Sequence, residues 1–520
     1  MLSLLGVLAG IVLLIYIYVR FNDQGLSHLP SEATAFAPNR FTQHVVRETA
    51  EKLSSSPKIV KDVLPTKTGR RYIIVGAGFL GGWIIIQLLE RGEDPKKIRI
   101  LDIRPPTRSD LRTGLAAQVA FFQVDISNAK AVDDAFQAPW PDCDASETAP
   151  EVTVFHTAAN IRFYERHLTL LPRSSKVNHE GTRNVINAAR SIGVTALIYT
   201  SSGSISVRRS RFWLWPWEKH PKYFVQVIND DDNLIPKYHD HFFSNYAASK
   251  VLGERAVRAA DGSRSGEKTL RTGCIRPGNG VFGPGGDLMC GAYLVRKHNP
   301  TWVDNIMQSF VYVENCALAH LCYEARLLET ARGGPNPDLG GQAFTITDTG
   351  PPVTFSDVYV GLTTLAPETT FTHMSPTLML FISQIIEVLY LSRIFLSISS
   401  SPVRRTLAHF IPNIVGDTVN LQPSLFALAA VHLIFDDSRA RLPPEKGGLG
   451  YHGPFTTLEG LCRTVEEHLK AGENGEERSH SGGVSLNCFR LRKVPKEVTR
   501  ISKMEKRVSE RLHVEAVDVG

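Results

Sequence analysis

The sequence predicts an α/β fold, with a doubly wound parallel sheet, a smaller mixed C-terminal part and an N-terminal membrane anchor. Three observations support this prediction. Short apolar runs alternate with stretches of helical periodicity, which is typical of a parallel sheet covered by helices on both faces. A glycine-rich turn joins the first of these runs to the first helical stretch. An uncharged apolar run opens the chain.

The predicted membrane anchor comprises residues 1–20. The run Leu2–Val19 carries no charge and is closed by Arg20. As a helix it spans roughly 27 Å, close to the ~30 Å hydrocarbon core of a bilayer. The alternative is a cleaved signal peptide, which is disfavoured because Tyr16 and Tyr18 stand where small residues are needed and no basic segment precedes the run. Arg20 favours a cytosolic body.

The first strand and helix follow a polar linker. Residues 21–67 form this linker, with one short helix expected around 41–53. The run Arg71–Val75 then predicts a buried strand that enters the glycine turn, and the apolar spacing over Trp83–Arg91 predicts a helix. The apolar run Ile98–Asp102 predicts the second strand.

The alternation of strands and helices continues downstream. Further short buried strands are predicted at Ala120–Val124, Val152–Phe155 and Ala196–Tyr199, with a helix over Val177–Ser191. The regular pattern weakens after about residue 255. The smaller, mixed part is therefore expected to begin there, and no internal repeats are visible.

The glycine turn has the spacing G-x-G-x-x-G between a predicted strand and a predicted helix. Gly76 allows the tight turn, Gly78 lets a pyrophosphate approach the backbone, and Gly81 lets the helix pack close to the strand. Phe79 and Leu80 open the helix, whose free N–H groups and dipole favour phosphate. The turn therefore predicts a Rossmann-type dinucleotide site; the alternative is a glycine-rich turn without a ligand.

The choice of dinucleotide depends on Asp102, which lies twenty-one residues after Gly81 at the end of the second strand. An acid there accepts hydrogen bonds from the adenosine ribose and repels a 2′-phosphate. NAD is therefore predicted as the cofactor. NADP stays open as the alternative because Arg104 and Arg108 follow closely.

The predicted catalytic residues are Ser202, Tyr246 and Lys250. A free tyrosine is a poor base at neutral pH, and a nearby ammonium lowers its pKa by favouring phenolate. Tyr246 and Lys250 lie four residues apart, which places both on one face of a helix. Ser202 would hold the substrate oxygen, with Ser201 as the alternative. The alternative is that Tyr246 and Lys250 are an ordinary pair of exposed side chains on a helix, without a catalytic role.

These motifs together resemble the extended short-chain dehydrogenases, and among them the 3β-hydroxysteroid dehydrogenase family, which includes sterol-4α-carboxylate 3-dehydrogenases. The resemblance covers roughly residues 70–470. It rests on the glycine turn, Leu101-Asp102, Val124-Asp125, Phe155-His-Thr-Ala-Ala159, Val177-Asn178, Gly181-Thr-Arg-Asn184, Tyr199-Thr-Ser-Ser202, Tyr246-Ala-Ala-Ser-Lys250, Arg276-Pro-Gly278, Phe310-Val-Tyr-Val313 with Asn315, and Phe435-Asp-Asp-Ser-Arg-Ala440.

The resemblance implies roles for single residues. Tyr246 would be the general base, and Lys250 would lower its pKa and hold the nicotinamide ribose. Ser202 would bind the substrate hydroxyl. The remaining implied cofactor-binding residues are Asp125 at the adenine, Ala158, Asn178 that steadies the active-site helix, and Pro277 near the nicotinamide.

The sequence departs from the family in two places. Val75 replaces the first glycine of the usual G-x-x-G-x-x-G pattern. The aromatic-rich segment 206–243 is expected to reshape the substrate mouth.

The resemblance also implies a domain organisation. Residues 68–470 would form the catalytic domain, whose mixed C-terminal part binds the substrate. The apolar stretch 378–398 contains Glu387 and Arg393, which makes a full bilayer crossing costly. It is interpreted either as a core or lid helix or as a helix that enters the membrane beside the active site. Residues 471–520 are predicted to be a basic, partly disordered tail.

Charge and cysteine content exclude several functions. Residues 490–511 hold nine Lys and Arg against three Glu, which accounts for the formal net charge of +6. The rest of the chain is near neutral, so no nucleic-acid partner is expected. The seven cysteines are scattered and never have C-x-x-C spacing, which disfavours disulfides and zinc and favours a reducing compartment. His156, His239 and His241 are interpreted as structural, so no metal is predicted.

The resemblance implies NAD(P)-dependent oxidation of a 3β-hydroxyl on a sterol or triterpenoid to the 3-ketone, with loss of a 4α-carboxyl as CO2 where one is present. Two alternatives are a 3β-hydroxysteroid dehydrogenase/Δ5-Δ4 isomerase and a terpenoid dehydrogenase of secondary metabolism. A third is a non-catalytic dinucleotide-binding membrane scaffold. The expected partners are the lipid-like substrate, the membrane, and a second copy or other membrane-bound enzymes. The expected location is the endoplasmic reticulum, with the body facing the cytosol.

Overall fold

The computed structural model describes residues 2–141, 150–287 and 289–473, so nearly all of the predicted basic tail lies outside it. Its main sheet has seven parallel strands in the order β14-β9-β5-β4-β1-β2-β3. The strands are β1 (Arg71–Val75), β2 (Ile98–Asp102), β3 (Ala120–Gln123), β4 (Val152–His156), β5 (Ala196–Thr200), β9 (Arg271–Pro277) and β14 (Gln342–Ile346).

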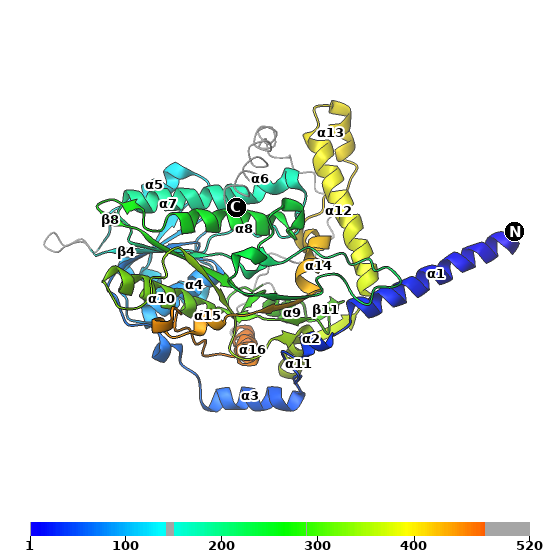
Figure 1. Cartoon of the computed structure of the whole chain (residues 1–520), viewed down its shortest axis with the longest axis horizontal. Helices are drawn as coiled ribbons and strands as arrows, with labels where there is room; N and C mark the ends of the chain where they lie inside the picture. Colours follow the sequence, from blue (N-terminus) through cyan, green and yellow to red (C-terminus); the bar gives the residue numbers. More distant parts are fainter. Residues whose placement is uncertain (1, 142–149, 288, 474–520) are drawn as a thin grey trace.

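Helices cover both faces of this sheet, as the doubly wound prediction requires (Figure 1). On one face α4 (Phe79–Glu90) packs against α10 (Val313–Ala331). The other face carries α5 (Ala129–Gln137), α7 (Thr182–Ser191) and α8 (Asn245–Ala259). Successive side chains of a strand point to opposite faces, so all five residues of β1 are buried. Its continuous apolar run follows from this burial on both sides.

The predicted and observed elements differ in informative ways. Strands β1 and β2 have the predicted bounds, and the next three differ by one residue. The helix predicted over 177–191 is divided into a π-helical turn, Lys176–Gly181, and α7. The main sheet also continues beyond residue 255 through β9, α10 and β14. The sequence did not reveal these later strands because long insertions separate them.

The smaller part is built on a mixed sheet of four strands in the order β15-β12-β17-β6. Its strands are β6 (Val225–Ile228), β12 (Met307–Gln308), β15 (Val353–Thr354) and β17 (His432–Phe435), and only the pairing of β12 with β15 is antiparallel. The segment 206–243 therefore supplies an edge strand of this sheet, β6. The predicted start of the mixed part after residue 255 is wrong for this reason.

Shorter elements complete the fold around the two sheets. The helices are α2 (Ser31–Thr34), α3 (Gln43–Ser55), α6 (Leu171–Ser175), α9 (Cys290–Arg296), α11 (Phe355–Leu365), α14 (Pro423–Ala429), α15 (Ser438–Arg441) and α16 (Thr457–Glu473). The strand pairs are β7 (Arg264–Ser265) with β8 (Lys268–Thr269), β10 (Val281–Phe282) with β13 (Val311–Tyr312), and β11 (His298–Thr301) with β16 (Thr370–His373).

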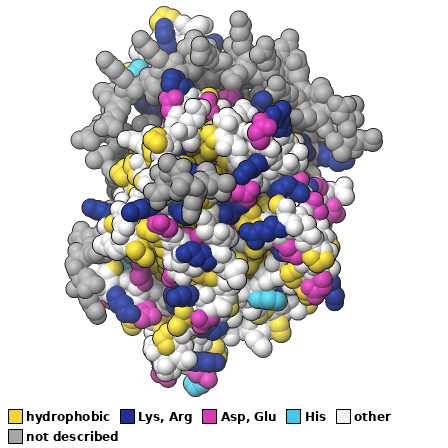
Figure 2. Space-filling model, turned by 90° about the vertical axis from the view of Figure 1, so that its left-hand side faces the viewer, with side chains coloured by type: hydrophobic (Ala, Val, Ile, Leu, Met, Phe, Trp, Pro, Cys, Tyr) yellow, Lys and Arg dark blue, Asp and Glu magenta, His cyan; other side chains and the backbone are white. Residues whose placement is uncertain are grey.

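Two helical arms project from the body (Figure 1). Helix α1 (Leu2–Leu26) extends past the predicted end of the anchor, and the apolar window of this N-terminal helix is not buried in the structure. Helix α12 (Pro376–Ile398) continues into α13 (Pro402–Ala408), and about a third of the apolar window of α12 is buried. Among the described residues, two helices are long and apolar enough to cross a membrane. They are the N-terminal helix that contains α1, and α12. On the end of the body away from α1, cationic and anionic side chains are interspersed (Figure 2).

A buried ion pair joins the sheet to α8. The Arg276 guanidinium on β9 donates to both carboxylate oxygens of Glu254 on α8, through Nε at 3.0 Å and Nη2 at 2.5 Å. It also donates to Asp232 at 2.6 Å. The side chains of Arg276 and Glu254 are 1% and 2% exposed. The pair therefore fixes α8 against the strand that passes beside it.

Replacing Glu254 with Gln is expected to lower the free energy of unfolding by about 3–5 kcal/mol, because it leaves the buried Arg276 guanidinium without its main counter-charge. Chemical denaturation of the purified protein measures the change. The matched control is Glu267→Gln, which removes an exposed ion pair with Arg264 and should cost less than about 1 kcal/mol. Equal losses in the two variants would contradict this role for Glu254.

Candidate active site

The glycine turn leads from β1 into α4, and two of its three glycines are required by close contacts. Gly76 has a φ of +89°, and a Cβ there would lie 2.6 Å from the Ala158 nitrogen. A Cβ at Gly81 would lie 1.9 Å from the Gly76 carbonyl oxygen. Gly78 is exposed, and nothing lies within 4 Å of a Cβ built on it. The open side of the turn is therefore at Gly78, where a pyrophosphate can approach the backbone.

The positive charge of Arg108 lies beside the start of α4. From the sequence, this arginine is only a reason to keep NADP open as the cofactor. Phe79 and Leu80 are half-buried in the first turn of α4. Arg108 donates to the Phe79 carbonyl at 3.2 Å, and its guanidinium lies 4.7 Å from the centroid of the Trp83 ring. Arg108 also pairs with Asp110. This arginine is therefore held beside the phosphate end of the turn.

The predicted ribose ligand Asp102 lies at the end of β2, next to the glycine turn. Its carboxylate accepts from the Ala77 nitrogen at 2.8 Å and from the Arg104 nitrogen at 3.1 Å. These bonds hold the carboxylate beside the turn. Asp125 is exposed just beyond β3, and Ala158 is half-buried just beyond β4. The carboxyl ends of parallel strands meet at one edge of the sheet, which brings these residues to the same side.

Asn178 links two segments that border the site. Its Oδ1 accepts from the Asn160 nitrogen at 2.7 Å, and its Nδ2 donates to the Asn160 carbonyl at 3.0 Å and to Ser249 Oγ at 2.9 Å. Ser249 lies on α8 and donates in turn to the Tyr246 carbonyl at 2.8 Å. Asn178 occupies the π-helical turn, a distortion that is frequent at functional sites. Asn160, which the sequence did not single out, directly follows the Phe155–Ala159 motif.

The structure brings the hydroxyls of Ser202 and Tyr246 together. Ser202 follows β5, its Oγ lies 2.8 Å from Ser204 Oγ, and it lies close enough to Tyr246 to lower the pKa of that phenol. Ser201, the alternative partner, is buried. Ser202 lowers the pKa of Tyr246, whereas Ser201 lowers that of Glu254, so Ser202 is the serine beside Tyr246.

Lys250 is fully buried below this pair. Its Nζ donates to the Thr200 carbonyl at 2.6 Å and lies 4.3 Å from the centroid of the Tyr199 ring. Burial lowers the pKa of Lys250 to about 7, and the Cys274 and Glu254 side chains oppose this shift. Thr200 is a further positioning residue, and its place at the end of β5 next to the Ser motif is the signal that could have identified it.

The pKa of Tyr246 moves in the opposite direction from the sequence prediction. Burial raises the pKa of this phenol, and the nearby Ser202 hydroxyl acts against the rise. Lys250 donates to the Thr200 carbonyl, and burial lowers its own pKa. The protein alone therefore keeps Tyr246 protonated at neutral pH, and a bound cationic nicotinamide would favour the phenolate.

Replacing Lys250 with Met is expected to stabilise the protein at pH 7 by up to a few kcal/mol, an advantage that shrinks toward pH 10. Between pH 7 and the usual lysine pKa near 10.4, the unfolded chain holds a proton that the folded chain has released, so folding gains stability as pH rises. Denaturation at several pH values measures this. Lys96→Met at an exposed position is the control, and a pH-independent difference for Lys250→Met would contradict the buried, deprotonating lysine.

The surroundings of the site are apolar on the side of the smaller sheet. The Tyr246 ring is only partly buried and packs against the apolar cluster that fills this part of the molecule. The cluster includes Phe243, Phe310, Phe355, Phe426 and Phe435. Pro277, the predicted nicotinamide neighbour, is buried at the end of β9. A substrate bound at Tyr246 therefore meets aromatic and aliphatic side chains.

Two of the histidines, His156 and His239, have structural partners. His156 lies 3.0 Å from Thr182 Oγ1, and burial lowers its pKa to about 3. His239 Nε2 lies 2.7 Å from Asn245 Oδ1. Among the residues that the structure describes, no group of three His, Cys, Asp or Glu side chains could hold a metal ion.

Comparison with known proteins supports the family resemblance. A family model described as the 3-beta hydroxysteroid dehydrogenase/isomerase family matches residues 72–366. The sterol-4-alpha-carboxylate 3-dehydrogenase (decarboxylating) of Schizosaccharomyces pombe is 31% identical over 282 residues, which are 53% of this chain and 69% of that protein. The 3beta-hydroxysteroid-dehydrogenase/decarboxylase isoform 1 of Arabidopsis thaliana is 29% identical over 425 residues, 78% of this chain and 82% of that protein.

Solved structures support the fold. The UDP-glucose 4-epimerase of Thermotoga maritima superposes with a TM-score of 0.50 at 17% identity, covering 77% of this chain and 99% of that one. This likeness concerns the architecture only. The family match extends over more than half of the chain and includes the glycine turn, the Ser motif and the Tyr and Lys positions. The chain therefore belongs to the 3-beta hydroxysteroid dehydrogenase/isomerase family and is an NAD(P)-dependent oxidoreductase that acts on CH–OH groups.

Proposed function

We propose that the protein oxidises the 3β-hydroxyl of a sterol or triterpenoid to the 3-ketone with NAD, and that a 4α-carboxyl, where present, leaves as CO2. The observation that carries this proposal is the meeting of the Ser202 and Tyr246 hydroxyls at the edge of an apolar cluster. The relatives named for sterol-4-alpha-carboxylate oxidation and 3β-hydroxysteroid oxidation support the substrate class.

The proposed chemistry assigns one task to each side chain. Ser202 donates a hydrogen bond to the alcohol oxygen, and Tyr246 as phenolate accepts the hydroxyl proton. Lys250 holds the end of β5 through the Thr200 carbonyl, so it keeps the Ser202 segment in register with α8. Bound NAD would accept the hydride from C3. Oxidation beside a 4α-carboxyl creates a β-keto acid, which loses CO2 because the new ketone stabilises the carbanion, so the proposal needs no dedicated decarboxylating residue.

The residues present fit a dinucleotide and favour NAD over NADP. The exposed Gly78 and the N-terminus of α4 would hold the pyrophosphate. The Asp102 carboxylate beside the turn would bind the adenosine ribose and repel a 2′-phosphate. Arg108 is already paired with Asp110, which reduces its availability for a 2′-phosphate.

We also propose that α1 anchors the protein in the endoplasmic reticulum membrane with the body on the cytosolic side. The exposure of its apolar window supports an anchor. The end of α1 is held by the body, since Asn22 Nδ2 donates to Thr377 Oγ1 at 2.9 Å and Tyr18 donates to the Leu214 carbonyl at 3.1 Å. Exposed apolar side chains of α12 support its contact with the same membrane. They are Leu378, Phe381, Ile382, Ile385 and Val388.

Product analysis with the purified full-length chain tests this function. The assay supplies NAD or NADP and a 3β-hydroxysterol with or without a 4α-carboxyl, and follows loss of two hydrogens or of two hydrogens plus CO2. Faster turnover with NAD and formation of the 3-ketone are expected. A Δ4-3-ketone would favour the dehydrogenase/isomerase alternative. Cofactor binding without oxidation across a sterol and triterpenoid panel would overturn the proposal in favour of a scaffold.

A further inference from the structure

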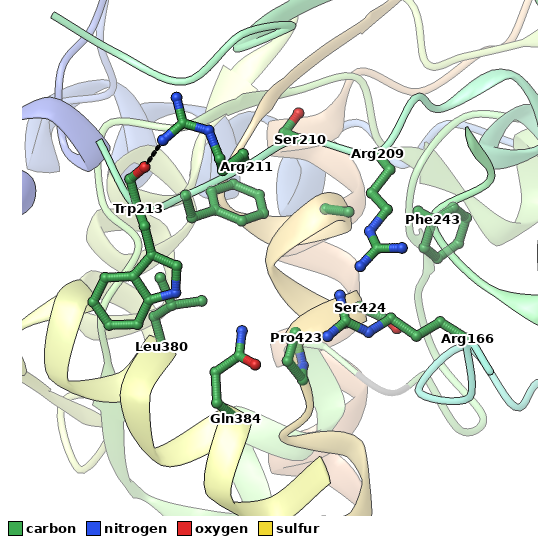
Figure 3. Close-up of a pocket in the computed structure, with 12 residues that line it drawn as sticks. Arg166, Arg209, Ser210, Arg211, Trp213, Phe243, Leu380, Gln384, Pro423 and Ser424 are labelled. Atoms are coloured by element: carbon green, nitrogen blue, oxygen red, sulfur yellow. Dashed lines mark hydrogen bonds between the residues drawn. The ribbon is translucent and has the colours of Figure 1, made fainter. Parts of the chain in front are cut away.

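A cavity of about 370 Å³ lies beside the start of α8 and the base of α12 (Figure 3). Phe243, three residues before Tyr246, forms part of its wall. Leu380 and Gln384 of α12 face it from another side, and Trp213 comes from the aromatic-rich segment. The cavity therefore lies between the body and α12, and it is separate from the dinucleotide site.

Two guanidinium groups meet in this cavity (Figure 3). Arg166 forms a two-pronged ion pair with Glu387 on α12. The Arg209 side chain points into the same space, and within the described residues no hydrogen bond or ion pair reaches its guanidinium. Partial burial and the neighbouring Arg166 charge lower the pKa of Arg209, and the Glu387 and Asp240 carboxylates oppose this shift. An anion beside Arg209 would accept charge-assisted hydrogen bonds from its guanidinium.

The cavity wall is attached to the proposed membrane anchor. The Trp213 ring stacks on Tyr18 of α1, with ring centroids 6.4 Å apart and 17° between the planes. Leu214, the next residue, donates from its backbone nitrogen to Asn22 at 2.9 Å. Trp215 and Trp217 follow, stacked on each other and exposed by 55% and 76%. Exposed tryptophans beside an apolar helix are typical of the membrane–water interface, which is the depth at which lipid phosphates lie.

We propose that this cavity binds the phosphate of an anionic glycerophospholipid, held by Arg209, since Arg166 is already paired with Glu387. A phosphate presents several acceptor oxygens that match the planar fork of the Arg209 guanidinium group. Phe212, Trp213, Phe243 and Leu380 in the wall supply apolar contact for the part of the lipid nearest its headgroup. The proposal rests on the proposed membrane attachment and is independent of which sterol is oxidised. The bound lipid would hold α12 and the Trp213 segment against the start of α8.

The melting temperature of the full-length protein in a neutral detergent tests this proposal. Dioctanoyl phosphatidic acid is expected to raise it by a few degrees, because a ligand that binds only the folded state stabilises that state. Dioctanoyl phosphatidylcholine and inorganic phosphate at the same concentration should have much smaller effects. Arg209→Gln should abolish the shift, Arg209→Lys should retain part of it, and Arg264→Gln, which alters an exposed arginine, should retain all of it.

Several outcomes would overturn the proposal. They are an equal shift in Arg209→Gln, no shift in the wild type, and a shift with inorganic phosphate or phosphatidylcholine as large as that with phosphatidic acid. Because Arg209 is at the surface, Arg209→Gln should fold, and its melting temperature without lipid verifies this. Sterol turnover by the wild type is measured separately. An Arg209-dependent lipid shift without sterol turnover would support the lipid site and reject the proposed function. Sterol turnover without such a shift would support the proposed function and reject the lipid site.

Discussion

Replacing Tyr246 with Phe is expected to lower the turnover of a 3β-hydroxysterol by about 10²–10⁴-fold, the usual contribution of a positioned acid–base group. The substitution removes only the phenolic oxygen, which lies near the Ser202 hydroxyl. The ring still packs against the apolar cluster. NAD affinity and melting temperature should therefore change little. Initial rates of NADH formation, with a separate titration of NAD binding, measure the two effects.

A matched variant separates this loss from a general effect on tyrosines. Tyr238→Phe removes the hydroxyl of a side chain that is 54% exposed, and its turnover should equal that of the wild type. If Tyr246→Phe kept more than about a tenth of the turnover, Tyr246 would not be the acid–base group. Ser202→Ala should lower turnover by a smaller factor, because Tyr246 would remain to accept the proton.

Replacing Gly81 with Ala is expected to weaken NAD binding by about 10- to 100-fold and to lower the melting temperature. The new Cβ would lie 1.9 Å from the Gly76 oxygen and 2.9 Å from Thr157 Oγ1, so α4 must move away from β1. Overpacking of this kind costs about 1–3 kcal/mol. The free N–H groups at the start of α4 move with the helix, which displaces the site for phosphate. Fluorescence titration with NADH and thermal unfolding measure both effects.

A second glycine variant distinguishes packing from ligand contact. Nothing lies within 4 Å of a Cβ at Gly78, so Gly78→Ala should leave the melting temperature unchanged and still weaken NAD binding, because the methyl group occupies the approach of the pyrophosphate. Gly472→Ala, which also meets open space, should change neither property. Normal NAD binding in both Gly78→Ala and Gly81→Ala would contradict the dinucleotide site.

Helix α8 organises the active site because successive side chains on it contact different parts of the protein. Tyr246 meets Ser202, Ser249 bonds to Asn178, Lys250 holds Thr200, and Glu254 pairs with Arg276. The helix therefore connects the carboxyl end of β5, the π-helical turn and β9. A change at Glu254 should consequently affect turnover as well as stability.

Much of the fold could be predicted from local sequence patterns. Strands β1 and β2 have their predicted bounds because buried parallel strands are short, continuous apolar runs. The glycine turn could be predicted because only glycine tolerates the φ of Gly76 and the close contact at Gly81. Strands β9 and β14 and the use of 225–228 in the second sheet could not, because their pairing partners are distant in sequence and no local pattern records them.

The sequence by itself determined the family, the dinucleotide turn and the order of the Ser, Tyr and Lys motifs, because these depend on residue type and short spacing. Only the tertiary structure decided that Ser202 and not Ser201 meets Tyr246, that Lys250 turns to Thr200, and that burial raises the pKa of Tyr246. It also placed Arg209 in a cavity beside α12. Each of these facts depends on desolvation and on contacts between distant segments, and both arise only when the chain folds.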